Sequence, residues 1–199
     1  MKLSRKVRIV LGGIIAVVLI APPVTYLIWQ MQARRAVEQF ASDATELAVE
    51  AGSDAVINEA QPATPLPHAS GTLSIPQHGI EMPIYGGSNA GVLYSGAWRF
   101  PGTADPGQPG NAVLFGHRFL KLPPSKNTMF RLGEVEVGET FTVQWGEEQL
   151  TYRIVDRSVV APDQLEIPLV EEKSVLTLIT CNPVFSTRER LVIRAVLEE

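Results

Sequence analysis

One cysteine and one arginine near the C-terminus could form the centre of a catalytic site. Cys181 is the only cysteine of the chain, and it follows an apolar, β-branched run at 174–180. Pro183 cannot donate a ladder hydrogen bond, so we predict that Cys181 lies where a buried strand ends. Arg190 opens the next apolar run. A thiol at a strand end, with a guanidinium on the neighbouring strand, is a candidate nucleophile with a candidate anion stabiliser.

His117 is the histidine best placed to act with this thiol. The chain has three histidines; His68 lies in a proline-rich spacer and His78 in a turn, and we expect both to be exposed to solvent. His117 instead follows a strand predicted at 112–115, behind Gly116. If the two strand ends lie on the same side of the sheet, imidazole and thiol can meet and exchange a proton.

Each of these residues also has a structural interpretation. His117 could be a hydrogen-bonded structural histidine, and Cys181 an inert buried thiol. Arg190 could form a surface salt bridge, for instance with Glu189. Arg188 competes with Arg190 for the catalytic role.

Short apolar segments separated by glycine- and proline-rich turns follow residue 70. We predict a long connection at 157–169 and a turn or short helix at 127–135, and the segment 92–98 is ambiguous. Strands are expected at 72–75, 80–84, 112–115, 140–145, 149–155, 174–180 and 190–197. Frequent short strands of this kind indicate an all-β barrel or sandwich.

The first 70 residues differ in character from the rest. A basic flank at 1–8 precedes a mostly aliphatic run without charge at 9–29, which predicts a transmembrane anchor. The positive flank places the N-terminus in the cytoplasm and the remainder of the single-pass protein outside the cell membrane. A cleaved signal peptide is the alternative, but a good cleavage site is lacking. Residues 30–70 are expected to be a helical or flexible stalk with a proline-rich linker, and 71–199 the catalytic domain.

Composition excludes several other functions. The formal net charge is −4 with acidic and basic residues well mixed, so nothing indicates nucleic-acid binding. A single cysteine excludes an internal disulfide, and no histidine or cysteine spacing suits a structural zinc site. Glu134, Glu136 and Glu139 are interpreted as a solvated loop face. We therefore expect no cofactor and no metal.

The motifs resemble those of sortases, the membrane-anchored cysteine transpeptidases of bacterial cell envelopes. Ala-Val-Leu-Phe-Gly-His-Arg at 112–118, Thr-Leu-Ile-Thr-Cys at 177–181 and an arginine before the last aliphatic strand occur in the family's order. The resemblance covers 71–197. The segment 100–111 and the residues around Cys181 are most similar to class E, with class D the nearest alternative. The pilin-polymerising class C usually has a second membrane helix after the barrel, and this chain ends at Glu199 without one.

The resemblance implies an eight-stranded β-barrel with a catalytic triad of His117, Cys181 and Arg190. It also implies that Thr180, beside the nucleophile, helps to shape the substrate groove, and that the connection at 157–169 lines it. Cys181 would attack the Thr–Gly carbonyl of a sorting signal like Leu-Pro-x-Thr-Gly or Leu-Ala-x-Thr-Gly. An amine of a cell-wall precursor would resolve the thioacyl intermediate. The implied partners are secreted proteins with a C-terminal sorting signal, that amine, and membrane lipid around the N-terminal helix.

Three other functions stay open at this point. A pilin-polymerising sortase would join the same intermediate to another protein. A cysteine protease would use water as the acceptor. A non-catalytic barrel that binds envelope peptides or polymers would leave Cys181 with an ordinary thiol pKa, near 8.5.

Overall fold

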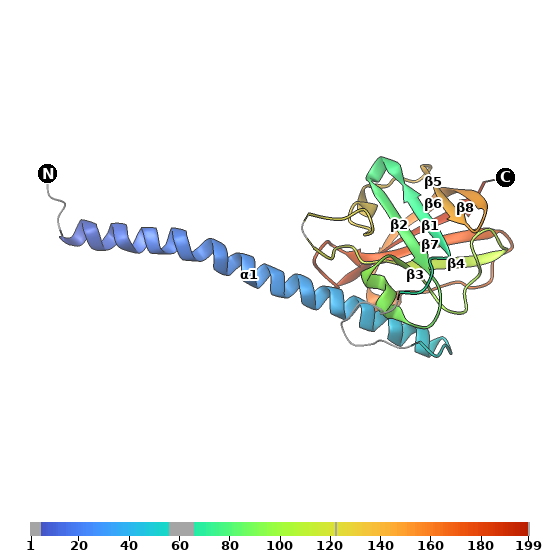
Figure 1. Cartoon of the computed structure of the whole chain (residues 1–199), viewed down its shortest axis with the longest axis horizontal. Helices are drawn as coiled ribbons and strands as arrows, with labels where there is room; N and C mark the ends of the chain where they lie inside the picture. Colours follow the sequence, from blue (N-terminus) through green and yellow to red (C-terminus); the bar gives the residue numbers. More distant parts are fainter. Residues whose placement is uncertain (1–4, 56–65, 122, 199) are drawn as a thin grey trace.

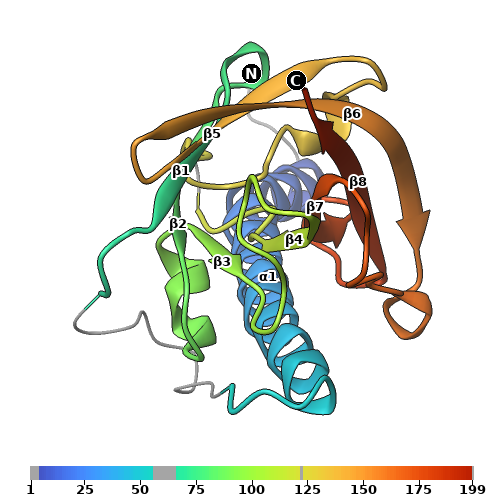
Figure 2. The same cartoon turned by 90° about the vertical axis from the view of Figure 1, so that its right-hand side faces the viewer.

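The eight strands close into one barrel, which confirms the predicted fold (Figures 1 and 2). The computed structural model describes residues 5–55, 66–121 and 123–198, with side chains from residue 18 onward. The strand order is β1-β2-β3-β4-β7-β8-β6-β5. The strands are β1 (Gly71–Ile75), β2 (Ile80–Tyr85), β3 (Ala97–Arg99), β4 (Gly110–Phe115), β5 (Thr140–Trp145), β6 (Glu148–Val160), β7 (Ser174–Asn182) and β8 (Glu189–Leu197). Short 3-10 helices connect them: η1 (Pro76–His78), η2 (Ala90–Tyr94), η3 (Leu132–Glu134) and η4 (Pro162–Gln164).

The barrel wall is buried on both faces at β4 and β7. Because side chains alternate along a strand, one set points into the barrel and the other points out of it. The inner set, which includes Leu114 and Leu178, belongs to the main core. The outer set, which includes Phe115 and Ile179, belongs to a second apolar cluster together with Phe40 from the N-terminal helix. Two-sided burial explains why both strands are apolar without alternation.

One helix, α1 (Arg5–Glu50), occupies the N-terminal region. It continues through Pro22 and Pro23 and joins the predicted anchor at 9–29 to the first half of the predicted stalk at 30–70. Its first half projects away from the barrel, whereas its last turns lie alongside it (Figure 1). Among the described residues, the structure contains no helix long and apolar enough to cross a membrane. Residues 1–4 of the basic flank and 56–65 of the linker lie outside the described residues.

The last turns of α1 pack on the barrel. A stripe of buried side chains recurs every three to four residues, which places it on one helix face. It consists of Ala33, Phe40, Ala41, Ala44 and Ala48. The small alanine side chains let the helix axis approach the barrel wall closely. Residues 33–48 are therefore part of the folded domain and not a free stalk.

The structure extends β6 beyond its predicted end. Its last residues, up to Val160, pair with β8, where Val160 lies opposite Arg190. The predicted connection at 157–169 is therefore strand over its first four residues, and the loop starts at Ala161. Long-range pairing of this kind leaves no local pattern in the sequence.

His78 does not have the solvent exposure that its turn predicts. Its side chain is only 11% exposed, and its Nε2 lies 2.8 Å from Glu139 Oε2. Glu139 is thus a partner of a half-buried imidazole and not simply part of a solvated loop face. The exposed His68, in contrast, agrees with its prediction.

Candidate active site

The ends of β4 and β7 bring His117 and Cys181 together. The two strands are parallel neighbours, with Phe115 opposite Ile179, and the Gly116 N–H donates to the Ile179 carbonyl oxygen at 3.1 Å. Because the C-terminal ends of parallel strands lie at the same edge of a sheet, the residues two positions further on are also neighbours. His117 and Cys181 line one cavity, so the two strand ends lie on the same side of the sheet and bring imidazole and thiol together.

Arg190 joins this pair from the adjacent strand. It lies directly opposite Cys181 in the antiparallel pairing of β7 with β8. Its side chain is only 2% exposed, and its Nη1 donates to the carbonyl oxygens of Thr187 at 3.0 Å and Glu189 at 3.2 Å. A surface salt bridge is therefore the wrong interpretation of Arg190. Arg188, its competitor for the catalytic role, is exposed.

The structure does not bring Thr180 to the same cavity. Adjacent residues of a strand point to opposite faces, so the Thr180 side chain points away from the face that carries Cys181. Thr180 is fully buried, and its hydroxyl has no hydrogen-bond partner among the described residues. This geometry does not support a substrate contact by the Thr180 side chain.

Helix α1 covers the three side chains. The Asp43 carboxylate accepts a hydrogen bond from Arg190 Nη2 in an ion pair. The Phe40 ring lies 5.3 Å from the His117 ring and 5.3 Å from the Arg190 guanidinium carbon. The cavity at Cys181, roofed by Ala33, Ala36 and Val37, has a volume of about 10 Å³. That space holds about one water molecule at most.

Residues 73–198 match the sequence profile of the family described as "Sortase domain". The chain belongs to the sortase family. The match includes β4, β7 and β8, and with them His117, Cys181 and Arg190.

Individual relatives agree with this membership. The chain is 36% identical to sortase D of Bacillus subtilis (strain 168) over 117 residues, which is 58% of this chain and 55% of that protein. It is 30% identical to sortase A of Bacillus anthracis over 124 residues, 62% of this chain and 57% of that protein. The match thus spans little more than half the length of these curated relatives.

Solved structures show the same fold. Sortase C-1 of Streptococcus pneumoniae superimposes with a TM-score of 0.60 and 27% identity, over 66% of this chain and 67% of that one. The relatives carry the class letters A, C and D, so similarity to them does not distinguish class E from class D.

Burial under α1 sets the protonation states in this sortase site. It lowers the pKa of His117 to about 3 and raises the pKa of the Cys181 thiol to about 12, although the Arg190 guanidinium opposes the shift at Cys181. Both shifts favour the neutral form of the group, because removal from water disfavours a charge. With α1 in place, the pair at neutral pH is a thiol and a neutral imidazole, not a thiolate and an imidazolium.

We therefore expect slow alkylation of Cys181 in the full chain, with a rate that rises continuously from pH 6 to pH 10. The raised thiol pKa keeps the thiolate fraction small throughout that range. Arg190 and Arg118 lower that pKa but do not outweigh burial, and the Asp43 carboxylate raises it further. Iodoacetamide labelling followed by intact mass measures this rate. A rate that levels off below pH 8 would contradict the prediction, because it would reveal a stabilised thiolate.

Arg118 is a site residue to which the sequence analysis gave no role. It is 8% exposed and lines the Cys181 cavity. Its Nε donates to the Phe130 carbonyl oxygen at 2.8 Å and its Nη1 to the Cys181 carbonyl oxygen at 3.2 Å. A Cβ added at Gly133 would lie 2.3 Å from Arg118 Nη2, so the guanidinium rests directly on that glycine. Its position next to His117 in the motif was the only signal in the sequence.

Arg118→Met is expected to destabilise the sortase domain by about 2–4 kcal/mol, because two partly buried carbonyl groups lose their donors. Urea unfolding gives the free energy of unfolding. Arg131→Met is the matched control, since Arg131 is half exposed and its ion pair with Glu134 lies on the surface; its effect should be much smaller than that of Arg118→Met. Equal effects of the two substitutions would show that the hydrogen bonds of Arg118 to Phe130 and Cys181 do not stabilise the domain.

No cluster of three or more histidine, cysteine, aspartate or glutamate side chains that could hold a metal ion occurs in the part of the chain that the structure describes. The groups that the described residues bring to the site are a thiol, an imidazole and two guanidinium groups.

Proposed function

We propose that this sortase is a cysteine transpeptidase with Cys181 as the nucleophile, His117 as the general acid and base, and Arg190 as the anion stabiliser. The observation that supports this most directly is that adjacent strand ends bring the three side chains to one face of the barrel. A nucleophile, a proton carrier and a fixed cation are the groups that acyl transfer needs.

The first half of the reaction forms a thioester. The Cys181 thiol gives its proton to His117, and the sulfur attacks the carbonyl carbon of the scissile peptide bond. The Arg190 guanidinium donates hydrogen bonds to the oxyanion that develops. When the C–N bond breaks, His117 returns the proton to the leaving amine, and the acyl group stays on sulfur.

The second half transfers the acyl group to an amine. The acceptor nitrogen attacks the thioester carbon and loses a proton to His117. The C–S bond then breaks, and the proton returns to the Cys181 sulfur. Water in place of the amine would give a free acid, which is the outcome of the cysteine protease.

The proposed substrate is a secreted protein with a C-terminal sorting signal like Leu-Pro-x-Thr-Gly or Leu-Ala-x-Thr-Gly, cut between threonine and glycine. The proposed acceptor is an amine of a cell-wall precursor. Both proposals rest on membership of the family and on the resemblance of the motifs to class E, with class D as the alternative.

We also place the protein in the cell membrane with the barrel outside the cell. Support comes from the exposed apolar side chains that surround the projecting part of α1. They include Val18, Leu19, Ile20, Leu27 and Ile28. Exposed apolar surface of this extent requires a cover, and lipid is the cover that fits the uncharged run at 9–29 of this helix. Protease accessibility of the barrel in intact cells tests this orientation.

The function is tested by incubating the full chain in detergent with either signal peptide and an amine acceptor, and by following the products by mass spectrometry. A ligated product is expected from at least one peptide, and the preferred peptide would indicate the class. Free acid alone, at saturating amine, would identify a protease. A chain that neither cuts nor ligates either peptide would contradict the proposed function.

A further inference from the structure

The strand order gives the candidate active site two different flanks. Cys181 lies on β7, which has β4 as its neighbour on one side and β8 on the other. His117 follows β4, and Arg190 belongs to β8. The residue that moves protons and the residue that stabilises an anion therefore lie on opposite sides of the thiol.

The proposed reaction assigns the amines to the β4 flank. His117 gives a proton to the leaving amine and later takes one from the acceptor amine, so both nitrogen atoms must come close to the imidazole. The oxyanion, in contrast, develops beside Arg190. A binding site for the acceptor should consequently lie on the β4 flank, and this expectation rests on the proposed function.

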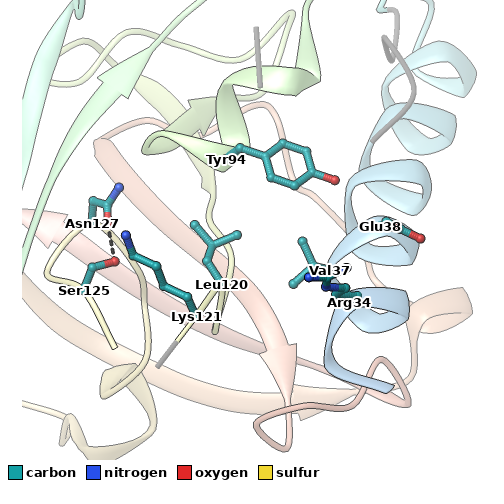
Figure 3. Close-up of a pocket in the computed structure, with 8 residues that line it drawn as sticks. All are labelled: Arg34, Val37, Glu38, Tyr94, Leu120, Lys121, Ser125 and Asn127. Carbon is teal, nitrogen blue, oxygen red and sulfur yellow. Dashed lines mark hydrogen bonds between the residues drawn. The ribbon is translucent and has the colours of Figure 1, made fainter. Parts of the chain in front are cut away.

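A cavity of about 430 Å³ lies on this flank, between α1 and the loop that follows β4 (Figure 3). The Tyr94 ring connects it to the catalytic side chains, because this ring lines the cavity and its centroid lies 5.3 Å from that of the His117 ring. Val37 lines both this cavity and the small cavity at Cys181. A ligand in the larger cavity is therefore a neighbour of His117.

Positive charge predominates in the cavity. Lys121 lies beside Ser125 and Asn127 on one wall, and Arg34 lies on the opposite wall (Figure 3). Within the described residues, neither Lys121 nor Arg34 forms an ion pair, and Glu38 is the only carboxylate that lines this space. Two cations without carboxylate partners, in a partly enclosed space, attract an anionic group such as a carboxylate.

The Tyr94 hydroxyl is a polar group without a partner in this cavity. The ring points toward α1 (Figure 3), and its oxygen is buried and forms no hydrogen bond with any described residue. Burial and, to a smaller extent, the Glu38 carboxylate raise the pKa of Tyr94, so the phenol is a neutral donor at pH 7. A buried hydroxyl without a partner destabilises the fold, and a hydrogen bond to a ligand would remove that cost.

The remaining lining is apolar. Val37 and Leu120, together with the Tyr94 ring, provide the surface against which methylene groups of a ligand can pack. A ligand that matches the whole cavity therefore has an acidic group at one end and an aliphatic stretch next to it.

We propose that this cavity is an acceptor subsite, which selects an amine on an aliphatic arm whose other end carries a carboxylate. Lys121 and Arg34 bind the carboxylate, and the Tyr94 hydroxyl donates a hydrogen bond to the same end of the ligand. The arm packs against Leu120 and the Tyr94 ring, and the amine reaches the thioester beside His117.

The first test compares two acceptors, N-acetyl-lysine and N-acetyl-lysinamide, which carry the same single amine and differ only in the carboxylate. The full chain in detergent ligates each to a signal peptide that ends in glycine amide, so the leaving group is too short to occupy the subsite. We expect the carboxylate form to have a kcat/KM about tenfold higher or more. Equal values for the two acceptors would overturn the proposal.

Lys121→Gln should raise the KM for N-acetyl-lysine about tenfold and remove most of the preference for the carboxylate. Lys126→Gln is the matched control and should behave like wild type. Lys126 is an exposed lysine of the same loop, pairs with Glu81 at 3.4 Å and does not line the cavity. A merely structural effect of Lys121→Gln would raise the KM for the signal peptide as well. An equal rise in both KM values would therefore contradict the subsite.

Tyr94→Phe removes the hydroxyl and keeps the ring beside His117. We expect the KM for N-acetyl-lysine to rise about threefold to tenfold. The midpoint of urea unfolding should stay the same or increase, because the hydroxyl has no hydrogen bond to lose. An unchanged KM together with an increased midpoint would show that the hydroxyl binds no acceptor and would overturn its place in the subsite.

A binding measurement separates this inference from the proposed function. Saturation-transfer NMR detects N-acetyl-lysine on the full-length Cys181→Ala chain, in which no thioester can form. Binding that weakens with Lys121→Gln, in a protein that ligates nothing, would support the subsite and contradict the transpeptidase. Ligation of both acceptors at equal rates would support the transpeptidase and overturn the subsite. Neither binding nor ligation would overturn both.

Discussion

Replacing Cys181 by alanine is expected to abolish acyl transfer, with a loss of about 10⁴-fold or more in the rate of peptide cleavage. The reason is that the remaining groups, an imidazole and a guanidinium, can polarise a carbonyl but cannot form the thioester. The fold should survive, because the substitution removes one sulfur atom from a small cavity at the barrel surface. Cleavage is measured by mass spectrometry in full-length chains, and urea unfolding verifies the fold.

Cys181→Ser tests whether a hydroxyl can replace the thiol at this position. A hydroxyl is close to a thiol in size but is a far weaker acid, so His117 removes its proton much less readily. Serine should therefore be nearly as inactive as alanine. Cleavage by Cys181→Ala at more than one hundredth of the wild-type rate would show that another residue carries the chemistry.

Replacing Arg190 by methionine should lower the rate of acyl transfer by about 10²–10³-fold, the effect of losing one oxyanion donor. The guanidinium is fixed by hydrogen bonds to the carbonyl groups of Thr187 and Glu189, and Arg190 lies directly opposite Cys181 in the strand pairing. Arg190→Lys should recover only part of the rate, since an ammonium group lacks the planar fork. Single-turnover formation of the thioester measures the step directly.

Arg188→Met is the matched control for this substitution. Arg188 is the other arginine at the start of β8, but it is exposed and does not line the Cys181 cavity. The Arg188→Met variant should transfer acyl groups at the wild-type rate. If Arg188→Met were as damaging as Arg190→Met, the assignment of the anion stabiliser to the buried arginine would be wrong.

The sequence predicted the barrel because its strands carry strong local signals. Pro183 marks the end of β7 at Asn182, and the glycine- and proline-rich turns separate most of the other strands. No local pattern in the sequence indicates that His117 and Cys181 lie close together. Their proximity depends on β4 and β7 being parallel neighbours, although about 60 residues separate them in the chain, and only the resemblance to a family implied it.

The position of α1 could not be predicted for a related reason. Residues 33–48 carry mostly alanine on their apolar face, a pattern equally typical of a free helical stalk. Asp43 is one acidic residue among several in that segment, and its partner lies 147 positions away. The burial of Arg118 and of His78 has the same cause, because their partners come from segments that only the closed barrel brings near them.

The most direct test of the central claim is a search for a thioacyl adduct on Cys181. The full chain is mixed with a signal peptide without an acceptor amine, quenched in acid and examined by intact mass and peptide mapping. We expect a mass increase equal to the peptide up to its threonine, located at Cys181, which disappears when an amine is added. Cleaved peptide without any adduct, or an adduct on another residue, would contradict the assignment of Cys181 as the nucleophile.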